Sequence, residues 1–305
     1  SQLGYSATPW SNVGKVDNWG WEFSTNYHHS INKDLSMDFR GNFTYVENKY
    51  VYRDEPYTPY PWKRETGRPL NSTWGYIAEG LYQTEDEIKY GPKVELGSTA
   101  QVGDIKYRDL NGDGVINGDD NHPMATYNLP VFNYGFVMGA EWKGVDISLN
   151  WQGAAGVYNS YDEVFTEVGP FNGGAVLDIY LDRWHTINPS DDPFNPSTQW
   201  VSGLYPATGH SFSNAGTGIK NTSYLRLKTL EIGYTLPKTW VAKAGVKDLR
   251  VYFNAYNLLT FTGLDNIDPE RPGRQGGANN GDSSGILFYN YPVNRTFNIG
   301  ATIKF

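Results

Sequence analysis

One segment of the sequence carries oxygen-bearing side chains at the spacing of a calcium loop. Counted from Asp109 as the first position, Gly114 stands where such a loop turns sharply, and hard oxygen ligands at this spacing suit Ca²⁺. The last position holds Asp120, whereas the bidentate residue of such loops is usually a glutamate. The alternative is a turn in which Asp and Asn side chains cap backbone amides without any metal. The predicted ligands are Asp109, Asn111, Asp113, Val115 (through its carbonyl), Asn117 and Asp120.

Aromatic side chains in the long polar segments are a second candidate binding feature. Their flat faces could stack on sugar rings or pack against a partner protein. The alternative is that they anchor loops or lie at a membrane interface, where Trp and Tyr are enriched. The candidate substrate-binding residues are Trp62, Trp74, Trp184 and Trp200.

Catalytic chemistry has little support in the sequence. None of the five histidines lies in an H-E-x-x-H pattern, and no G-x-S-x-G nucleophile elbow occurs. The adjacent His28 and His29 would point to opposite faces of a strand. We therefore expect no enzymatic activity.

Composition narrows the class of protein. The chain has 305 residues, no cysteine and a net charge of −8. These values exclude a disulfide-stapled fold and disfavour nucleic-acid binding, which needs clustered Lys and Arg. No apolar run reaches the ~18 residues of a membrane helix, but a barrel strand needs only about 10 residues with one apolar face.

Seven segments alternate between apolar and polar residues with a period of two, as a half-exposed strand does. In the last of them Phe297, Ile299, Ile303 and Phe305 share one face. In another, the phase changes near Lys228–Thr229, which predicts a β-bulge there. The predicted strands are 19–29, 35–47, 131–142, 145–153, 223–236, 248–260 and 294–305.

The connections between these segments alternate in length. Short turns lie near Ser30–Asp34, Glu141–Gly144 and Pro237–Lys247, and long excursions span roughly 49–129, 156–221 and 262–291. Outer-membrane barrels combine short periplasmic turns with long extracellular loops. If Phe305 is periplasmic, every short turn is periplasmic and every long loop extracellular. The pattern predicts an all-β, antiparallel transmembrane barrel rather than a soluble sandwich. Because seven strands do not close an even-numbered barrel, we expect further strands before Ser1.

Five stretches of the sequence resemble motifs of the SusC/RagA family, the TonB-linked outer-membrane transporters of Bacteroidetes. They follow the family order along nearly the whole chain and include a segment similar to G-D-I-K-Y-x-D-x-N-G-D-G. The matching stretches are Asn12–Asn18, Gly103–Gly114, Tyr224–Lys228 with Gly233–Pro237, Arg250–Tyr252 with Asn257–Thr260, and Tyr291–Pro292 with Arg295–Phe297.

The resemblance implies more than the pattern does. It implies that residues 1–305 are the C-terminal part of a 22-stranded barrel, whose plug and earlier strands lie outside this sequence. It implies active import of oligosaccharides or peptides through the bacterial outer membrane. The implied partners are a SusD-like surface lipoprotein and TonB, reached through the N-terminal region, besides membrane lipid. Two other classes remain open, a secreted glycan-binding β-module and a passive porin.

Overall fold

The computed structural model describes residues 14–70, 72–97, 99–126, 130–160, 181–206, 219–264, 268–270 and 293–305. The chain divides into two compact units. One comprises residues 1–19, 47–125 and 175–216, and the other comprises residues 20–46, 126–174 and 217–305.

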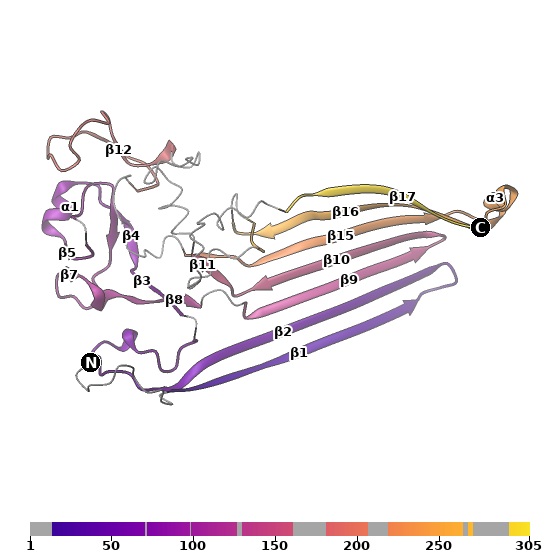
Figure 1. The fold of residues 1–305 in the computed structure, drawn as a ribbon, viewed down its shortest axis with the longest axis horizontal. Helices are drawn as coiled ribbons and strands as arrows, with labels where there is room; N and C mark the ends of the chain where they lie inside the picture. The colour runs from indigo at the N-terminus through magenta and orange to yellow at the C-terminus, as the bar shows by residue number, and fades with distance from the viewer. Residues whose placement is uncertain are drawn as a thin grey trace, which may run out of the picture. The chain divides into compact units, whose positions relative to one another are not determined.

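Most of the second unit belongs to a seven-stranded sheet in the order β1-β2-β9-β10-β15-β16-β17 (Figure 1). Each pair of neighbours from β2 to β17 is antiparallel, and β1 lies beside β2. Apart from the gaps left by long excursions, strands adjacent in sequence are therefore adjacent in space, as in an up-and-down barrel wall. The strands are β1 (Gly14–Ser30), β2 (Leu35–Arg53), β9 (Phe132–Trp142), β10 (Val145–Ala155), β15 (Tyr224–Thr235), β16 (Asp248–Thr262) and β17 (Thr296–Lys304).

All seven predicted strands are confirmed, and most extend beyond the predicted limits. The largest extension is in β2, which runs six residues past the predicted end at residue 47, to Arg53. The predicted bulge is also confirmed, because the pairing of β15 with β16 shifts between Leu227 and Thr229. Alternation identifies strands well because only one of the two faces has to be apolar.

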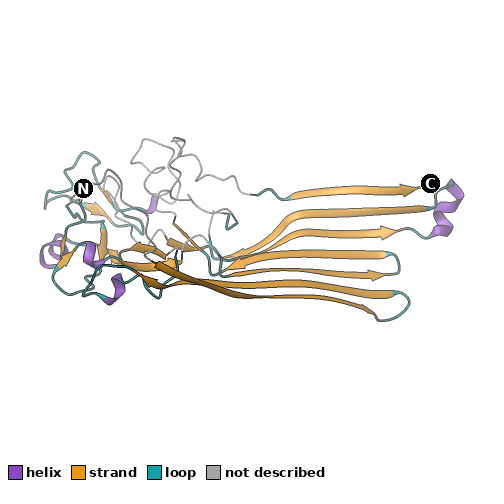
Figure 2. Ribbon diagram, turned by 60° about the horizontal axis from the view of Figure 1, so that its bottom comes forward, coloured by secondary structure: helices purple, strands orange, loops and turns teal. Residues whose placement is uncertain are grey.

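The three short turns lie at one end of this sheet, together with the C-terminus (Figures 1 and 2). The β15–β16 turn is longer than the others and contains α3 (Lys238–Val241) followed by a 3-10 turn, Ala242–Ala244. The second unit also holds the small pair β11 (Tyr158–Ser160) and β14 (Ile219–Asn221).

The first unit has a small core of its own, within the segment 49–129 that the sequence pattern assigns to a long excursion. Tyr76, Ile105, Tyr107 and Ile116 are buried together, with Ala78, Leu81, Val94 and Leu96 packed around them. Its elements are β3 (Ser72–Gly75) with β8 (His122–Thr126), β4 (Ala78–Leu81) with β6 (Ile105–Tyr107), the parallel pair β5 (Lys93–Val94) and β7 (Val115–Ile116), β12 (His185–Thr186) with β13 (Trp200–Val201), and α1 (Glu85–Tyr90).

Two- to five-residue strands carry too little alternation to be recognised in a sequence. That is why the folded character of this unit was missed. No helix in the described part of the chain is long and apolar enough to cross a membrane.

Candidate functional site

The seven-stranded sheet has one apolar face and one polar face, and the strand register sets the difference. One row of directly paired residues runs Met37–Ala140–Ile147–Ile232–Phe253–Ile299 and is apolar throughout. The neighbouring row, one residue along each strand, runs Asp38–Gly139–Ser148–Glu231–Asn254–Asn298 and contains no large apolar residue. Successive side chains point to opposite faces, so the two rows lie on opposite sides of the sheet.

Large apolar side chains on the first face are exposed to a degree that is unusual in a soluble domain. Met37 is 49% exposed, Phe297 is 57% exposed and Ile299 is 88% exposed. Contiguous exposed apolar surface of this kind marks an interaction with another protein or with lipid. We call this side of the sheet the apolar face, and the opposite side, with the Asp38–Asn298 row, the polar face.

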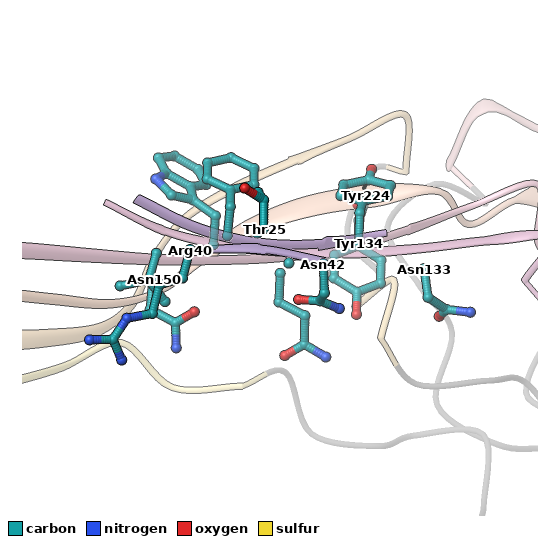
Figure 3. A pocket seen from close by; sticks show the side chains of 14 residues that line it. Thr25, Arg40, Asn42, Asn133, Tyr134, Asn150 and Tyr224 are labelled. Atoms are coloured by element: carbon teal, nitrogen blue, oxygen red, sulfur yellow. Dashed lines mark hydrogen bonds between the residues drawn. The ribbon is translucent and has the colours of Figure 1, made fainter. Parts of the chain in front are cut away.

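A hollow of ≈ 470 Å³ adjoins the polar face, lined there by the amides of Asn42, Asn133, Asn150 and Gln152 and by Arg40. Figure 3 shows that Arg40, Asn42 and Asn150 project to one side of the strands, away from Thr25. Amide groups both donate and accept hydrogen bonds. This wall is suited to a polar ligand with many hydroxyl or amide groups.

A glycine on β9 gives this wall its shape. A Cβ built on Gly135 would lie 2.9 Å from Oδ1 of Asn42, nearer than real Cβ atoms approach. The missing side chain therefore lets Asn42 lie across the neighbouring strand. Two glycines farther along the polar face act in the same way, since Gly233 makes room for the guanidinium of Arg250 and Gly300 for the ring of Tyr252.

Among the described residues of the second unit, the most deeply buried charges gather around Arg226 on β15. Arg226 and Asp268 have side chains that are only 4% and 5% exposed, and their Nη2 and Oδ1 atoms lie 2.9 Å apart. Arg226 also forms an ion pair with Glu270 and donates from Nε to the hydroxyl of Thr260 at 2.9 Å. Lys228 Nζ lies 2.6 Å from Glu270 Oε1, so two cations and two anions balance.

The same cluster attaches a segment outside the strands to the polar face. Asp268 accepts hydrogen bonds from the backbone N–H groups of Glu270 and Val293 at 3.0 and 3.1 Å. Burial by itself would raise the pKa of the Asp268 carboxyl, but these two amides and the Arg226 guanidinium outweigh it and lower the pKa. Asp268 is therefore charged, and both of its carboxylate oxygens accept hydrogen bonds.

A second ion cluster lies on the polar face nearer the short turns. Arg250 on β16 forms ion pairs with Asp146 on β10 and Glu231 on β15, and its Nε donates to Asp146 Oδ1 at 3.0 Å. It therefore ties three neighbouring strands together. Sequence analysis missed both clusters. The sequence signals a charge on the polar side of a strand at Arg226 and Arg250. It does not indicate their partners, because these lie 19 to 104 residues away in the chain.

The predicted calcium loop forms a compact turn in the first unit. Both carboxylate oxygens of Asp109 accept backbone amides, from Gly112 at 2.7 Å and Gly114 at 2.8 Å. Both oxygens of the fully buried Asp120 do the same, from Leu110 at 2.8 Å and Asn117 at 2.9 Å.

The remaining predicted ligands follow the same pattern. Asp113 Oδ1 accepts the Val115 amide at 2.8 Å, and Asn111 Oδ1 accepts the Asp113 amide at 3.0 Å. Asn117 caps the 3-10 turn Gly118–Asp120. The structure thus brings all the predicted residues onto one loop.

These bonds are the ones expected of a capped turn, and each oxygen retains a further lone pair for a cation. Across the part of the chain that the structure describes, no three His, Asp or Glu side chains gather as a metal site. Calcium binding would therefore need the amide and carbonyl oxygens of Asn111, Val115 and Asn117 in addition to the carboxylates, and it stays a prediction.

The four candidate tryptophans all lie in the first unit. Trp62 stacks on Tyr60 at 5.1 Å between ring centroids and donates from Nε1 to the Asp119 carbonyl at 2.9 Å, which fastens it to the calcium-loop segment. Trp184 is buried with Val102, and Trp200 packs against it. Trp74 lies on β3, half-buried. These contacts give three of the rings a packing role, and none of them tests substrate binding.

Comparison with known proteins shows which sequences and folds this chain resembles. No family model matches the chain. The sequence is 28% identical over 309 residues to TonB-dependent receptor P3 of Formosa agariphila, a match that covers 96% of this chain and 29% of the receptor. It is 24% identical over 321 residues to TonB-dependent receptor SusC of Bacteroides thetaiotaomicron, covering 99% of this chain and 28% of SusC. The chain therefore resembles TonB-dependent receptors of the SusC type over nearly its whole length.

Solved structures give the same fold. The RagAB peptide importer in its open-open state matches with a TM-score of 0.64 at 24% identity, over 96% of this chain and 29% of that one. Its closed-closed state matches with a TM-score of 0.60 at 25% identity. The SusC/RagA-like resemblance seen in the sequence is therefore confirmed, and so is the antiparallel barrel-type fold. The chain spans under a third of the length of these relatives.

Proposed function

We propose that this chain forms part of the barrel wall of a TonB-dependent importer in the bacterial outer membrane. The observation that carries the proposal is that one sheet has two different faces. Across six strands, an exposed apolar row lies on one face and a polar row lies on the other. Such a sheet is stable where lipid meets one side and a water-filled passage meets the other. The similarity to TonB-dependent receptors supports the same function.

In this proposal the apolar face contacts lipid and the polar face lines the passage. The amides around Asn42 and Asn150, together with Arg40, would contact a hydrogen-bonding solute as it passes. Oligosaccharides and peptides both fit this chemistry, and the related RagAB is a peptide importer. A SusD-like surface lipoprotein and TonB would be the partners of the whole transporter. The chain itself would act as a wall and perform no catalysis.

The orientation can be tested with single cysteines, because residues 1–305 contain none. We expect Ser190→Cys in a long excursion to react with a membrane-impermeant maleimide on intact cells. We expect Lys33→Cys in the β1–β2 turn to react only after the outer membrane is opened. The protein as the cell makes it should also require detergent for extraction. Release in soluble form would favour a secreted glycan-binding module instead.

Uptake measurements separate an importer from a porin. Cells that carry the protein should accumulate labelled oligosaccharide or peptide, and dissipating the proton-motive force should abolish the accumulation. Uptake that persists after dissipation would favour a passive porin.

We also propose that the Asp109–Asp120 loop binds one Ca²⁺ in a structural role. The spacing of its oxygen-bearing residues along the sequence supports this. A fully coordinated ion would stiffen the long excursion between β2 and β9 and leave no open position for catalysis.

A further inference from the structure

The turn between β15 and β16 differs from the other short turns in both structure and charge. It is helical, formed by α3 (Lys238–Val241) and the 3-10 turn Ala242–Ala244, and it ends at Gly245 with φ of 72°. Its sequence, from Pro237 to Lys247, contains three lysines and no acidic residue. A turn that merely reverses the chain needs two to five residues, so the extra length calls for another explanation.

The side chains of this turn divide into a packed set and a free set. Val241 is buried, whereas Trp240 is 66% exposed. Lys247 donates from Nζ to the backbone oxygen of Phe305 at 2.8 Å, which ties the turn to the C-terminus. Lys238 and Lys243 are exposed, and neither forms an ion pair or side-chain hydrogen bond within the described ranges of the chain. The turn therefore presents a tryptophan and two unpaired cations to its surroundings.

The neighbouring β9–β10 turn repeats this combination. Lys143 places its Nζ 5.5 Å from the ring centroid of Trp142, and Trp142 is 55% exposed. The two turns are adjacent, because the Thr235 amide donates to the Gly144 carbonyl at 2.7 Å. Figure 2 shows both at the same end of the sheet. Trp142 continues the apolar face, since it follows Met138 and Ala140 along β9.

The acidic residues near these turns do not cancel the exposed cations. Asp146 is held by Arg250 on the polar face. Glu141 is next to Trp142 in the strand and so points to the polar side. Asp248 lies opposite Lys304 in the register of β16 with β17. Asp34, whose backbone carbonyl accepts the Lys143 amide, directly follows Lys33 in the β1–β2 turn, so this turn adds no net charge. Positive charge and indole rings therefore remain together where the apolar face ends.

We propose that this surface, the Pro237–Lys247 turn with Trp142 and Lys143, binds the phosphate head groups of anionic phospholipids in the periplasmic leaflet. The proposal rests on the proposed membrane function. Indole rings prefer the boundary between hydrocarbon and head groups, where one edge is apolar and the other is wet. Lysines at that depth are attracted to anionic lipid, and the attraction decays over about one Debye length from the membrane surface. The unpaired lysine charges favour an anionic lipid over a zwitterionic or neutral one.

The test is native mass spectrometry of the protein as the cell makes it, purified in detergent and titrated with phosphatidylglycerol or phosphatidylcholine. We expect preferential retention of phosphatidylglycerol. In the Lys238→Gln/Lys243→Gln variant that affinity should fall about fivefold for each lysine removed. The matched control, Lys89→Gln/Lys93→Gln, removes two exposed lysines from the first unit and should bind as the native protein does.

Equal retention of the two lipids by the native protein would overturn the proposal, as would equal losses in the variant and the control. Loss of a co-purifying periplasmic protein from the variant, with lipid retention unchanged, would also overturn it and assign the turn to that partner. Membrane extraction measured on the same samples tells the two proposals apart. A soluble protein refutes the membrane function, whereas a membrane-embedded protein without lipid preference refutes only this inference.

Discussion

Arg226 on β15 and Asp268, beyond the end of β16, form an ion pair with both side chains almost fully withdrawn from solvent. The pair joins a strand of the sheet to a segment that lies more than forty residues later in the chain. Because each group has further hydrogen bonds, to Thr260, Glu270 and Val293, neither charge is left uncompensated. A buried pair of this kind fixes one arrangement of the chain more than it adds net stability.

Removing one member of this pair should be costly. Arg226→Met leaves Asp268 and Glu270 buried without their cation, and we expect a loss of about 3–5 kcal/mol in the free energy of unfolding. Urea unfolding in lipid vesicles would measure it. The control is Arg53→Met, which breaks the half-exposed ion pair with Glu65 and should cost less than about 1 kcal/mol. Equal losses in the two variants would refute the special role of Arg226.

The same pair predicts a dependence on acid. The folded-state pKa of Asp268 is lowered, so its contribution to stability is present above the unfolded-state value of about 3.9 and is lost as the pH falls through the folded-state pKa. We expect native protein to lose stability below about pH 4 more steeply than Asp268→Asn does. Unfolding midpoints measured between pH 3 and pH 7 would show it, and parallel curves would contradict it.

Gly233 should be required for the Arg250 side chain to lie over β15 and reach Asp146. A Cβ on Gly233 would collide with the Arg250 guanidinium, whereas one on Gly139 would meet its nearest neighbour, Asp38, at an ordinary 3.5 Å. We expect Gly233→Ala to displace Arg250 from Asp146 and to lower the free energy of unfolding by about 1–3 kcal/mol. Gly139→Ala should be nearly neutral. The prediction fails if both substitutions have the same effect.

The apolar face should reject charge in a way that the polar face does not. Ile299→Lys places an ammonium group in the middle of β17 on the apolar face and should cost about 2–4 kcal/mol in a bilayer. Thr302→Lys, on the opposite face of the same strand, should be tolerated. Unfolding of both variants in vesicles measures the difference, and a tolerated Ile299→Lys would contradict contact with lipid.

Calcium binding by the Asp109–Asp120 loop can be decided by titration. We expect isothermal titration of the native protein with Ca²⁺ to show one site that Asp109→Ala/Asp113→Ala abolishes, because two of its three carboxylates are gone. Asp86→Ala/Asp191→Ala removes two carboxylates elsewhere and should leave the site intact. A native protein that takes up no Ca²⁺ leaves the capped turn as the whole role of this loop.

The sequence by itself determined the strands of the sheet and the two kinds of face. Period-two alternation depends only on neighbouring residues, so Phe297, Ile299 and Ile303 could be assigned to one face without any partner in view. The bulge at Lys228 was visible for the same reason, as a change of phase within one strand. The calcium-loop residues could be proposed because their spacing is local as well, and their metal binding stays a prediction.

Only the tertiary structure decided the contacts between residues that are distant in the sequence. Whether Arg226 meets Asp268 depends on where a long connection returns to the sheet, and whether Gly233 matters depends on Arg250 in the next strand. The core of the first unit joins Tyr76, Tyr107 and Ile116 from strands too short to show a period. Long-range contacts of this kind follow from chain closure and packing over many residues, and no pattern within a single segment records them.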